Sequence, residues 1–168
     1  YGTFENPVFL GSGGSCTSDA GGARGGNGGG KIAIQANTLV NNGTISANGG
    51  NAVSSGVGNG QSGAGGSGGS IKITAASISG TGAITAKGGY GAILFGYTPL
   101  SGGSGGRVAL FYSTLSLPAE NVTAAAGSLY AGAGTVYLQQ GSDPGHLIID
   151  NQQQYFDSLT PCLTNLDT

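Results

Sequence analysis

The sequence predicts an all-β protein: a glycine-rich parallel β-helix, or solenoid, with terminal segments that do not repeat. Two blocks of equal length, residues 29–50 and 68–89, align without a gap. In both blocks apolar residues alternate with other residues at a period of two, which is typical of strands with one buried face. Glycine supplies 37 of the 168 residues and is clustered between these runs, as expected if it separates strands.

We expect a single domain in three parts. Residues 1–28 form an N-terminal segment with a glycine-rich lead-in, residues 29–151 form the repeat solenoid, and residues 152–168 form a C-terminal tail. Both terminal segments carry large apolar residues and differ from the repeats. They would either cap the ends of the solenoid, which every solenoid needs, or act as arms that pair with another subunit.

Each repeat is expected to contain a long strand, a turn and a short strand. Six positions of the first block recur in the second: Ile32, Ile34, Ala36, Gly43, Ile45 and Ala47 return as Ile71, Ile73, Ala75, Gly82, Ile84 and Ala86. A third copy covers residues 107–110 and 121–124, and a degraded fourth copy covers 135–138 and 146–150. The spacing predicts that the isoleucines of one repeat stack on those of the next.

Two strand arrangements are compatible with this pattern. The turn at Asn42-Gly43 between apolar runs is also a hairpin signal, which would give an antiparallel meander. The equal spacing of isoleucine and alanine between copies favours the solenoid, with coils of about 20 residues. Glycine clusters would then form the corners of each coil, where close backbone approach is needed. Lys31 follows one cluster, but the sequence around it does not match a phosphate-binding loop, and no helix is expected after it.

The composition of the chain excludes two kinds of partner. Charged residues make up 7% of the sequence and the net charge is −2. No basic patch exists, so we expect no nucleic acid, and no apolar stretch is long enough for membrane insertion. Because self-repulsion is weak, the surface is suited to packing against copies of the same chain.

Catalysis is not expected. The seven acidic residues lie outside both clear repeats, so they cannot form the clustered acids of polysaccharide-cleaving β-helices; they are Glu5, Asp19, Glu120, Asp143, Asp150, Asp157 and Asp167. His146, the single histidine, lies beside Asp143 and is interpreted as a turn residue rather than a general base. No zinc-ligand spacing or calcium-binding repeat occurs, so we predict no metal, no cofactor and no catalytic residue.

The two cysteines, Cys16 and Cys162, lie near opposite ends of the sequence. They would form a disulfide, within one chain or between neighbouring subunits, or remain two buried thiols. On the chain-entropy model, closing so long a loop would stabilise the fold by about 4–5 kcal/mol. Asn42 and Asn121 each begin an N-glycosylation triplet, and the alternative for Asn42 is an ordinary turn residue.

Tyr90, Phe95 and Tyr97 lie in one short stretch, residues 90–100. An aromatic loop of this kind could stack on sugars or pack on a neighbouring subunit. The alternative is a local cluster that covers the flank of the repeats.

The unit I-x-I-x-A-x-x-L-x-N-x-G-x-I-x-A-x-G, here Ile32 to Gly49, resembles the repeats of filamentous-haemagglutinin-type adhesins. The wider order of motifs also resembles a glycine-rich module of very large surface proteins of bacteria and protists. The resemblance implies a right-handed parallel β-helix that is secreted to the cell surface. It implies no catalytic residues, and the two cysteines and the tail after Asn151 lie outside the pattern.

Together these features predict an extracellular structural protein, a subunit that assembles with copies of itself into a surface fibre, filament or sheath. Repeats, minimal charge and apolar terminal segments favour this function. The alternative is an adhesin or carbohydrate-binding module of a larger surface protein that contacts surface glycans through the aromatic stretch.

Overall fold

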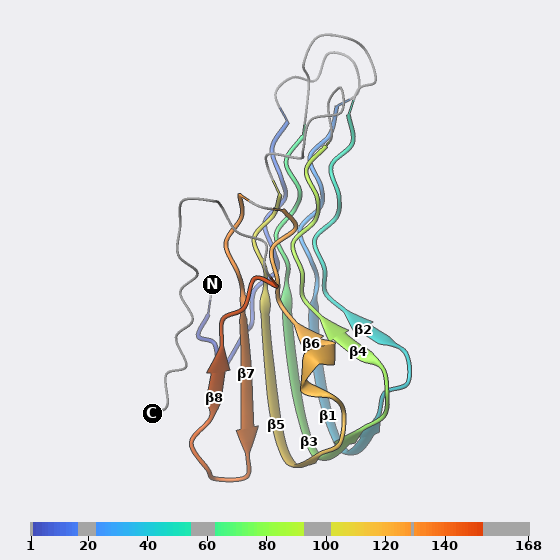
Figure 1. Cartoon of the computed structure of the whole chain (residues 1–168), viewed down its shortest axis with the longest axis vertical. Helices are drawn as coiled ribbons and strands as arrows, with labels where there is room; N and C mark the ends of the chain where they lie inside the picture. The colour runs from blue at the N-terminus through green and yellow to red at the C-terminus, as the bar shows by residue number, and fades with distance from the viewer. Residues whose placement is uncertain (1, 17–22, 55–62, 93–101, 129, 153–168) are drawn as a thin grey trace.

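The computed structural model describes residues 2–16, 23–54, 63–92, 102–128 and 130–152. Its elements are β1 (Lys31–Val40), β2 (Thr44–Ser46), β3 (Ser70–Ser79), β4 (Ala83–Thr85), β5 (Arg107–Leu115), the short 3-10 helix η1 (Ala119–Asn121), β6 (Val122–Thr123), β7 (Thr135–Gln140) and β8 (His146–Ile148). A five-stranded sheet has the order β1-β3-β5-β7-β8, and a three-stranded sheet has the order β2-β4-β6. The smaller sheet lies against one face of the larger one (Figure 1).

The predicted stacking of one repeat on the next is confirmed. β1 pairs in parallel with β3, and Ile34 lies opposite Ile73; β5 and β7 continue this row with Leu110 and Leu138. The short strands pair in the same order, with Ile45 opposite Ile84. The alternating side chains of both sheets therefore meet in one core.

The predicted parallel β-helix is wrong, because the strands form a mixed five-stranded sheet and a separate parallel sheet. Equivalent positions such as Lys31 and Ser70 lie 39 residues apart, about twice the expected coil. The fourth copy departs further, since β8 pairs antiparallel with β7 instead of joining β6. Only five residues connect β7 to β8, whereas a parallel connection needs a dozen or more.

The glycine clusters do not form corners. They continue the strands as extended segments that run side by side in a narrow bundle beyond the sheets (Figure 1). Their backbones are joined directly by N–H···O=C hydrogen bonds of 2.7–3.2 Å. These glycine segments are residues 11–16, 23–30, 47–54, 63–69, 86–92, 102–106, 124–128 and 131–134.

Three layers make up this bundle. The middle layer contains the segments that lead into β1, β3, β5 and β7, and the inner layer contains those that follow β2, β4 and β6. The N-terminal segment 11–16 forms the outer layer. Segment 63–69 is the centre of the bundle, because it exchanges hydrogen bonds with five neighbouring segments from all three layers.

Successive residues of segment 63–69 face different neighbours. A methyl group on Gly65 would overlap the carbonyl oxygen of Gly89 in the inner layer, and one on Gly66 would overlap that of Asn27 in the preceding segment. The next residue, Ser67, has its side chain on the outer face. Three residues per turn is the period of an extended polyproline-type helix, so two of every three positions must be glycine here.

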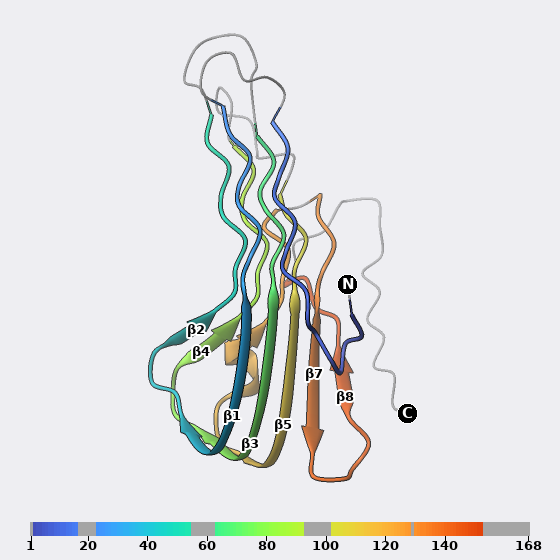
Figure 2. The ribbon, with the colours of Figure 1, turned by 180° about the vertical axis from the view of Figure 1, so that it is seen from behind.

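The N-terminal segment crosses the outer face of the large sheet before it enters the bundle (Figure 2). Pro7 is fully buried, and the Phe4 ring lies 5.2 Å from that of Tyr137. The Lys72 ammonium donates to the Asn6 side-chain oxygen at 2.9 Å. The segment therefore covers the sheet face instead of an end of the stack, which differs from the cap that was one of the two expected alternatives.

This packing also changes the electrostatics of Tyr137. Burial raises the pKa of its hydroxyl above the usual value, and the nearby Glu5 carboxylate raises that pKa further. Burial likewise raises the pKa of Tyr112. Both phenols are therefore neutral at physiological pH and behave as packing groups.

Replacing Gly66 with alanine should lower the free energy of unfolding by about 2 kcal/mol or more, because the added methyl group overlaps the Asn27 backbone. Gly30→Ala is the control, since no atom lies within 4 Å of its Cβ position. That variant should be neutral or more stable by about 0.4–1 kcal/mol. Denaturant unfolding measures both, and equal losses would contradict the packing described.

Replacing Ile73 with aspartate should cost about 4 kcal/mol or more, because the side chain has no exposed surface and the charge would be buried without a partner. Thr74→Asp, one position along on the exposed face of β3, should cost about 1 kcal/mol or less. Thermal unfolding of the two variants checks the phase of the strand. A greater loss at Thr74 would show that the faces are reversed.

Candidate functional site

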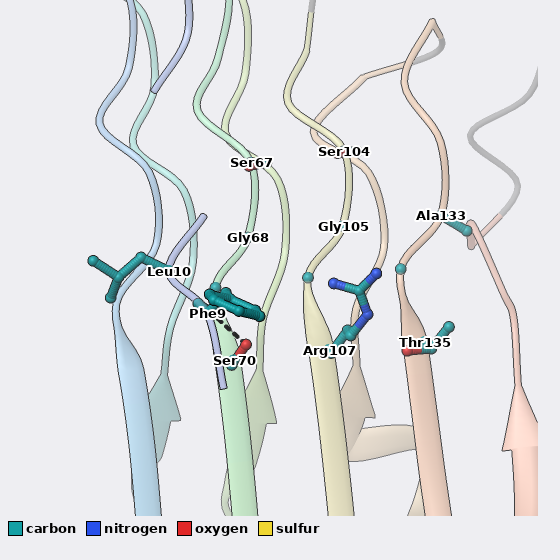
Figure 3. Close-up of a pocket in the computed structure, with 13 residues that line it drawn as sticks. Phe9, Leu10, Ser67, Gly68, Ser70, Ser104, Gly105, Arg107, Ala133 and Thr135 are labelled. Atoms are coloured by element: carbon teal, nitrogen blue, oxygen red, sulfur yellow. Dashed lines mark hydrogen bonds between the residues drawn. The ribbon is translucent and has the colours of Figure 1, made fainter. Parts of the chain in front are cut away.

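A groove of about 330 Å³ lies on the outer face of the molecule, where β3, β5 and β7 begin (Figure 3). Phe9 and Leu10 form one wall, with 53% and 65% of their surfaces exposed. The floor is mostly bare backbone, supplied by residues 67–70, 104–107 and 133–135. Large side chains are few because every one of these positions except Arg107 is glycine, serine, alanine or threonine.

Hydroxyl groups and one guanidinium surround this floor. The Ser70 hydroxyl donates to the Phe9 carbonyl oxygen at 2.6 Å, which fixes the wall over the floor. The Thr135 hydroxyl oxygen is buried and has no hydrogen-bond partner among the described residues. The Arg107 side chain extends between the starts of β5 and β7 (Figure 3). The groove thus combines an aromatic wall with both donors and acceptors.

Sequence reasoning did not predict this groove. Ser67, Ser70, Ser104 and Arg107 recur at intervals of three after glycine pairs, and this spacing was the available signal. Phe9 joins them only because the N-terminal segment folds back over the sheet, which no local pattern reveals.

A second candidate surface is the end of the molecule formed by β1 and β2. These strands are the edges of the two sheets, and within the described residues the outer edge of β1 has no strand beside it. Ile32 and Ile34 are only partly buried, whereas their partners Ile71 and Ile73 have 0% of their surface exposed. This end is therefore apolar and has unpaired backbone groups.

In the glycine bundle, the same end of the molecule carries exposed side chains instead of an open apolar edge. Arg24 and Asn27 stand where the next repeat has Gly63 and Gly66, and both side chains are exposed. A further glycine segment could not approach closely on this side, because these side chains occupy its place. Any added strand is therefore restricted to the β-sheet half.

The predicted aromatic stretch is only partly described. Tyr90 has 54% of its surface exposed, while Phe95 and Tyr97 lie outside the described residues. The backbone N–H of Tyr90 donates to the Asn51 side-chain oxygen at 2.9 Å, and the backbone N–H of Lys87 donates to the Asn48 side-chain oxygen at 2.7 Å. The inner-layer surface therefore carries an aromatic ring beside two amides and an ammonium group.

The predicted modification sites fall in different places. Cys16 is exposed and its backbone bridges to Gly63, while Cys162 lies outside the described residues, so the disulfide stays a prediction. Asn42 is exposed in the turn after β1. The Asn121 side-chain nitrogen donates to the carbonyl oxygens of residues 81 and 82 at 3.2 Å, so a glycan there would replace at least one of the two hydrogens that form these bonds.

The titratable groups of the described residues form no obvious centre. His146 begins β8 rather than lying in the turn, and its side chain is exposed. Within the described ranges, no three His, Cys, Asp or Glu residues come together in a way that could hold a metal ion. The same part of the chain contains no helix long and apolar enough to cross a membrane.

Comparison of the chain with protein-family models, with curated proteins and with solved structures finds no match. The resemblance to surface-protein repeats therefore stays a prediction, and the β-helix that it implies is not the fold described above.

Proposed function

We propose that the chain is an extracellular structural subunit that assembles with copies of itself through the end formed by β1 and β2. The observation that carries this proposal is the difference between equivalent isoleucines. Ile71 and Ile73 are fully buried by a neighbouring repeat, whereas Ile32 and Ile34 remain partly exposed beside an open strand edge. An added strand would bury this apolar surface and pair the open backbone.

A second copy of the chain is the occupant that this end favours. The outer edge of β1 is equivalent to the edge of β3 that pairs with β1 inside the molecule. A strand with a similar pattern is therefore complementary to it. The small net charge of −2 opposes such association only weakly.

The geometry also decides which strand of the second copy can take part. The parallel strands β1, β3, β5 and β7 cannot continue into β1 of the next copy, because β8 covers the outer edge of β7. Within the part of the chain that the structure describes, the other unpaired edge of this sheet is that of β8. Pairing of β1 with β8 of the next copy is a head-to-tail contact and extends into a filament, whereas pairing of β1 with β1 closes a dimer. A surface fibre requires the first arrangement.

Ile34→Lys should prevent this assembly, because a charge on the inner face of the edge strand opposes pairing while its long stem can still reach solvent. Ala33→Lys places the same charge on the exposed face of the same strand and should leave assembly intact. Light scattering and negative-stain images of both variants, with thermal unfolding to confirm folding, provide the measurement. Dispersed monomers of the unaltered chain at high concentration would contradict the proposal.

A second candidate function is an adhesin or carbohydrate-binding module, and the surface around Tyr90 favours it. An exposed aromatic ring beside amide groups can pack on the apolar face of a sugar while the amides bind its hydroxyls. Binding on a glycan array should be lost in Tyr90→Ala and kept in Tyr130→Ala, which alters a tyrosine of similar exposure. The absence of binding to any glycan would reject this alternative.

A further inference from the structure

The N-terminal segment shows which groups the outer face of the bundle offers. Gly11 donates its N–H to the carbonyl oxygen of Gly29 at 2.8 Å, and Ser67 donates its N–H to the carbonyl oxygen of Ser12 at 2.9 Å. The Gly29 acceptor and the Ser67 donor point outward from two neighbouring segments of the middle layer, and a second such pair of bonds follows at residues 14 and 15.

The same two groups recur one segment further along the face, and there they are unused. By the register of β1, β3 and β5, Gly68 corresponds to Gly29 and Ser104 corresponds to Ser67. Among the described residues, neither the Gly68 carbonyl oxygen nor the Ser104 N–H takes part in a hydrogen bond. Both residues line the groove beside Phe9.

A peptide strand cannot fill this place as the N-terminal segment fills its own. A Cβ atom on Gly28 would overlap the Gly11 carbonyl oxygen, so that contact requires glycine. The residue that corresponds to Gly28 in the next segment is Ser67, which has a Cβ atom. The Ser67 side chain, which is hydrogen-bonded to Ser12, occupies the place that a peptide carbonyl would need. The occupant must therefore be compact and must reach the backbone groups beside that side chain.

The remaining groups of the groove indicate the chemistry of that occupant. The unpartnered hydroxyl of Thr135 is buried at the far side, and the exposed Phe9 ring forms the near wall. Hydroxyls that both donate and accept would pair with the Gly68 carbonyl, the Ser104 N–H and the Thr135 hydroxyl. A volume of about 330 Å³ lies at the small end of the range for ligand sites.

We infer that this groove binds a hexopyranose unit of a glycan, with its C–H face against Phe9 and its hydroxyls on the bare backbone of the floor. A pyranose ring combines an apolar face with hydroxyls around its rim, which is the combination that the groove provides. The site is separate from the β1–β2 end and from the surface around Tyr90, so it does not depend on either proposed function.

Titration of the full-length chain with methyl β-D-glucopyranoside, methyl β-D-galactopyranoside and methyl α-D-mannopyranoside tests the inference. Amide NMR shifts should appear at Ser104 and at the neighbouring floor glycines with at least one of the three, with a dissociation constant on the order of 1 mM. Thr135→Val removes the hydroxyl at nearly constant shape and should weaken binding by about fivefold or more. Ser104→Phe should abolish binding by filling the groove.

Thr81→Val is the matched control, because it removes an exposed hydroxyl in the turn before β4 and should leave binding unchanged. Three results would overturn the inference: no shift at the groove amides with any of the glycosides up to about 100 mM, shifts confined to the surface around Tyr90, or groove shifts that persist in Ser104→Phe. A peptide of sequence Gly-Ser-Gly-Gly-Ser that bound the groove more tightly than every glycoside would also reject it.

Discussion

Close contact between glycine backbones is the constraint on which the rest of the structure depends. In segment 63–69 two of three successive residues face a neighbouring carbonyl group at a separation that no side chain allows. The hydrogen bonds of the bundle are possible only at this separation. Glycine loses more conformational entropy on folding than any other residue, so such segments would not order alone. The apolar strands that continue them hold the bundle in register.

Side chains in the bundle therefore indicate which faces are uncovered. Asn27 has a side chain where the next repeat has Gly66, because no described segment precedes it in the middle layer. Gly28 and Ser67 show the converse, since the N-terminal segment lies directly against the Gly28 backbone, whereas the Ser67 side chain fills the corresponding place and hydrogen-bonds Ser12. This difference between two repeats of similar sequence explains why the N-terminal segment binds at one position and leaves a groove at the next.

The strands could be predicted from the sequence, but the glycine segments and the groove could not. Alternating isoleucines fix both the face and the register of β1 and β3, because a one-residue shift would expose all of them. Glycine pairs are compatible with either a corner or an extended segment, and nothing local distinguishes the two. β8 has the same apolar alternation as a parallel strand, and only its short connection to β7 determines its direction.

The division of the molecule into an apolar sheet half and a backbone bundle has a thermal consequence. Unfolding the sheets exposes isoleucine and leucine to water, which raises the heat capacity, whereas unfolding the bundle exposes mainly peptide groups, which lowers it. The heat-capacity change per residue should then fall below the usual value of about 12–15 cal/mol/K. A small heat-capacity change flattens the dependence of stability on temperature. Cooling therefore weakens this protein less than one held together by apolar contacts alone.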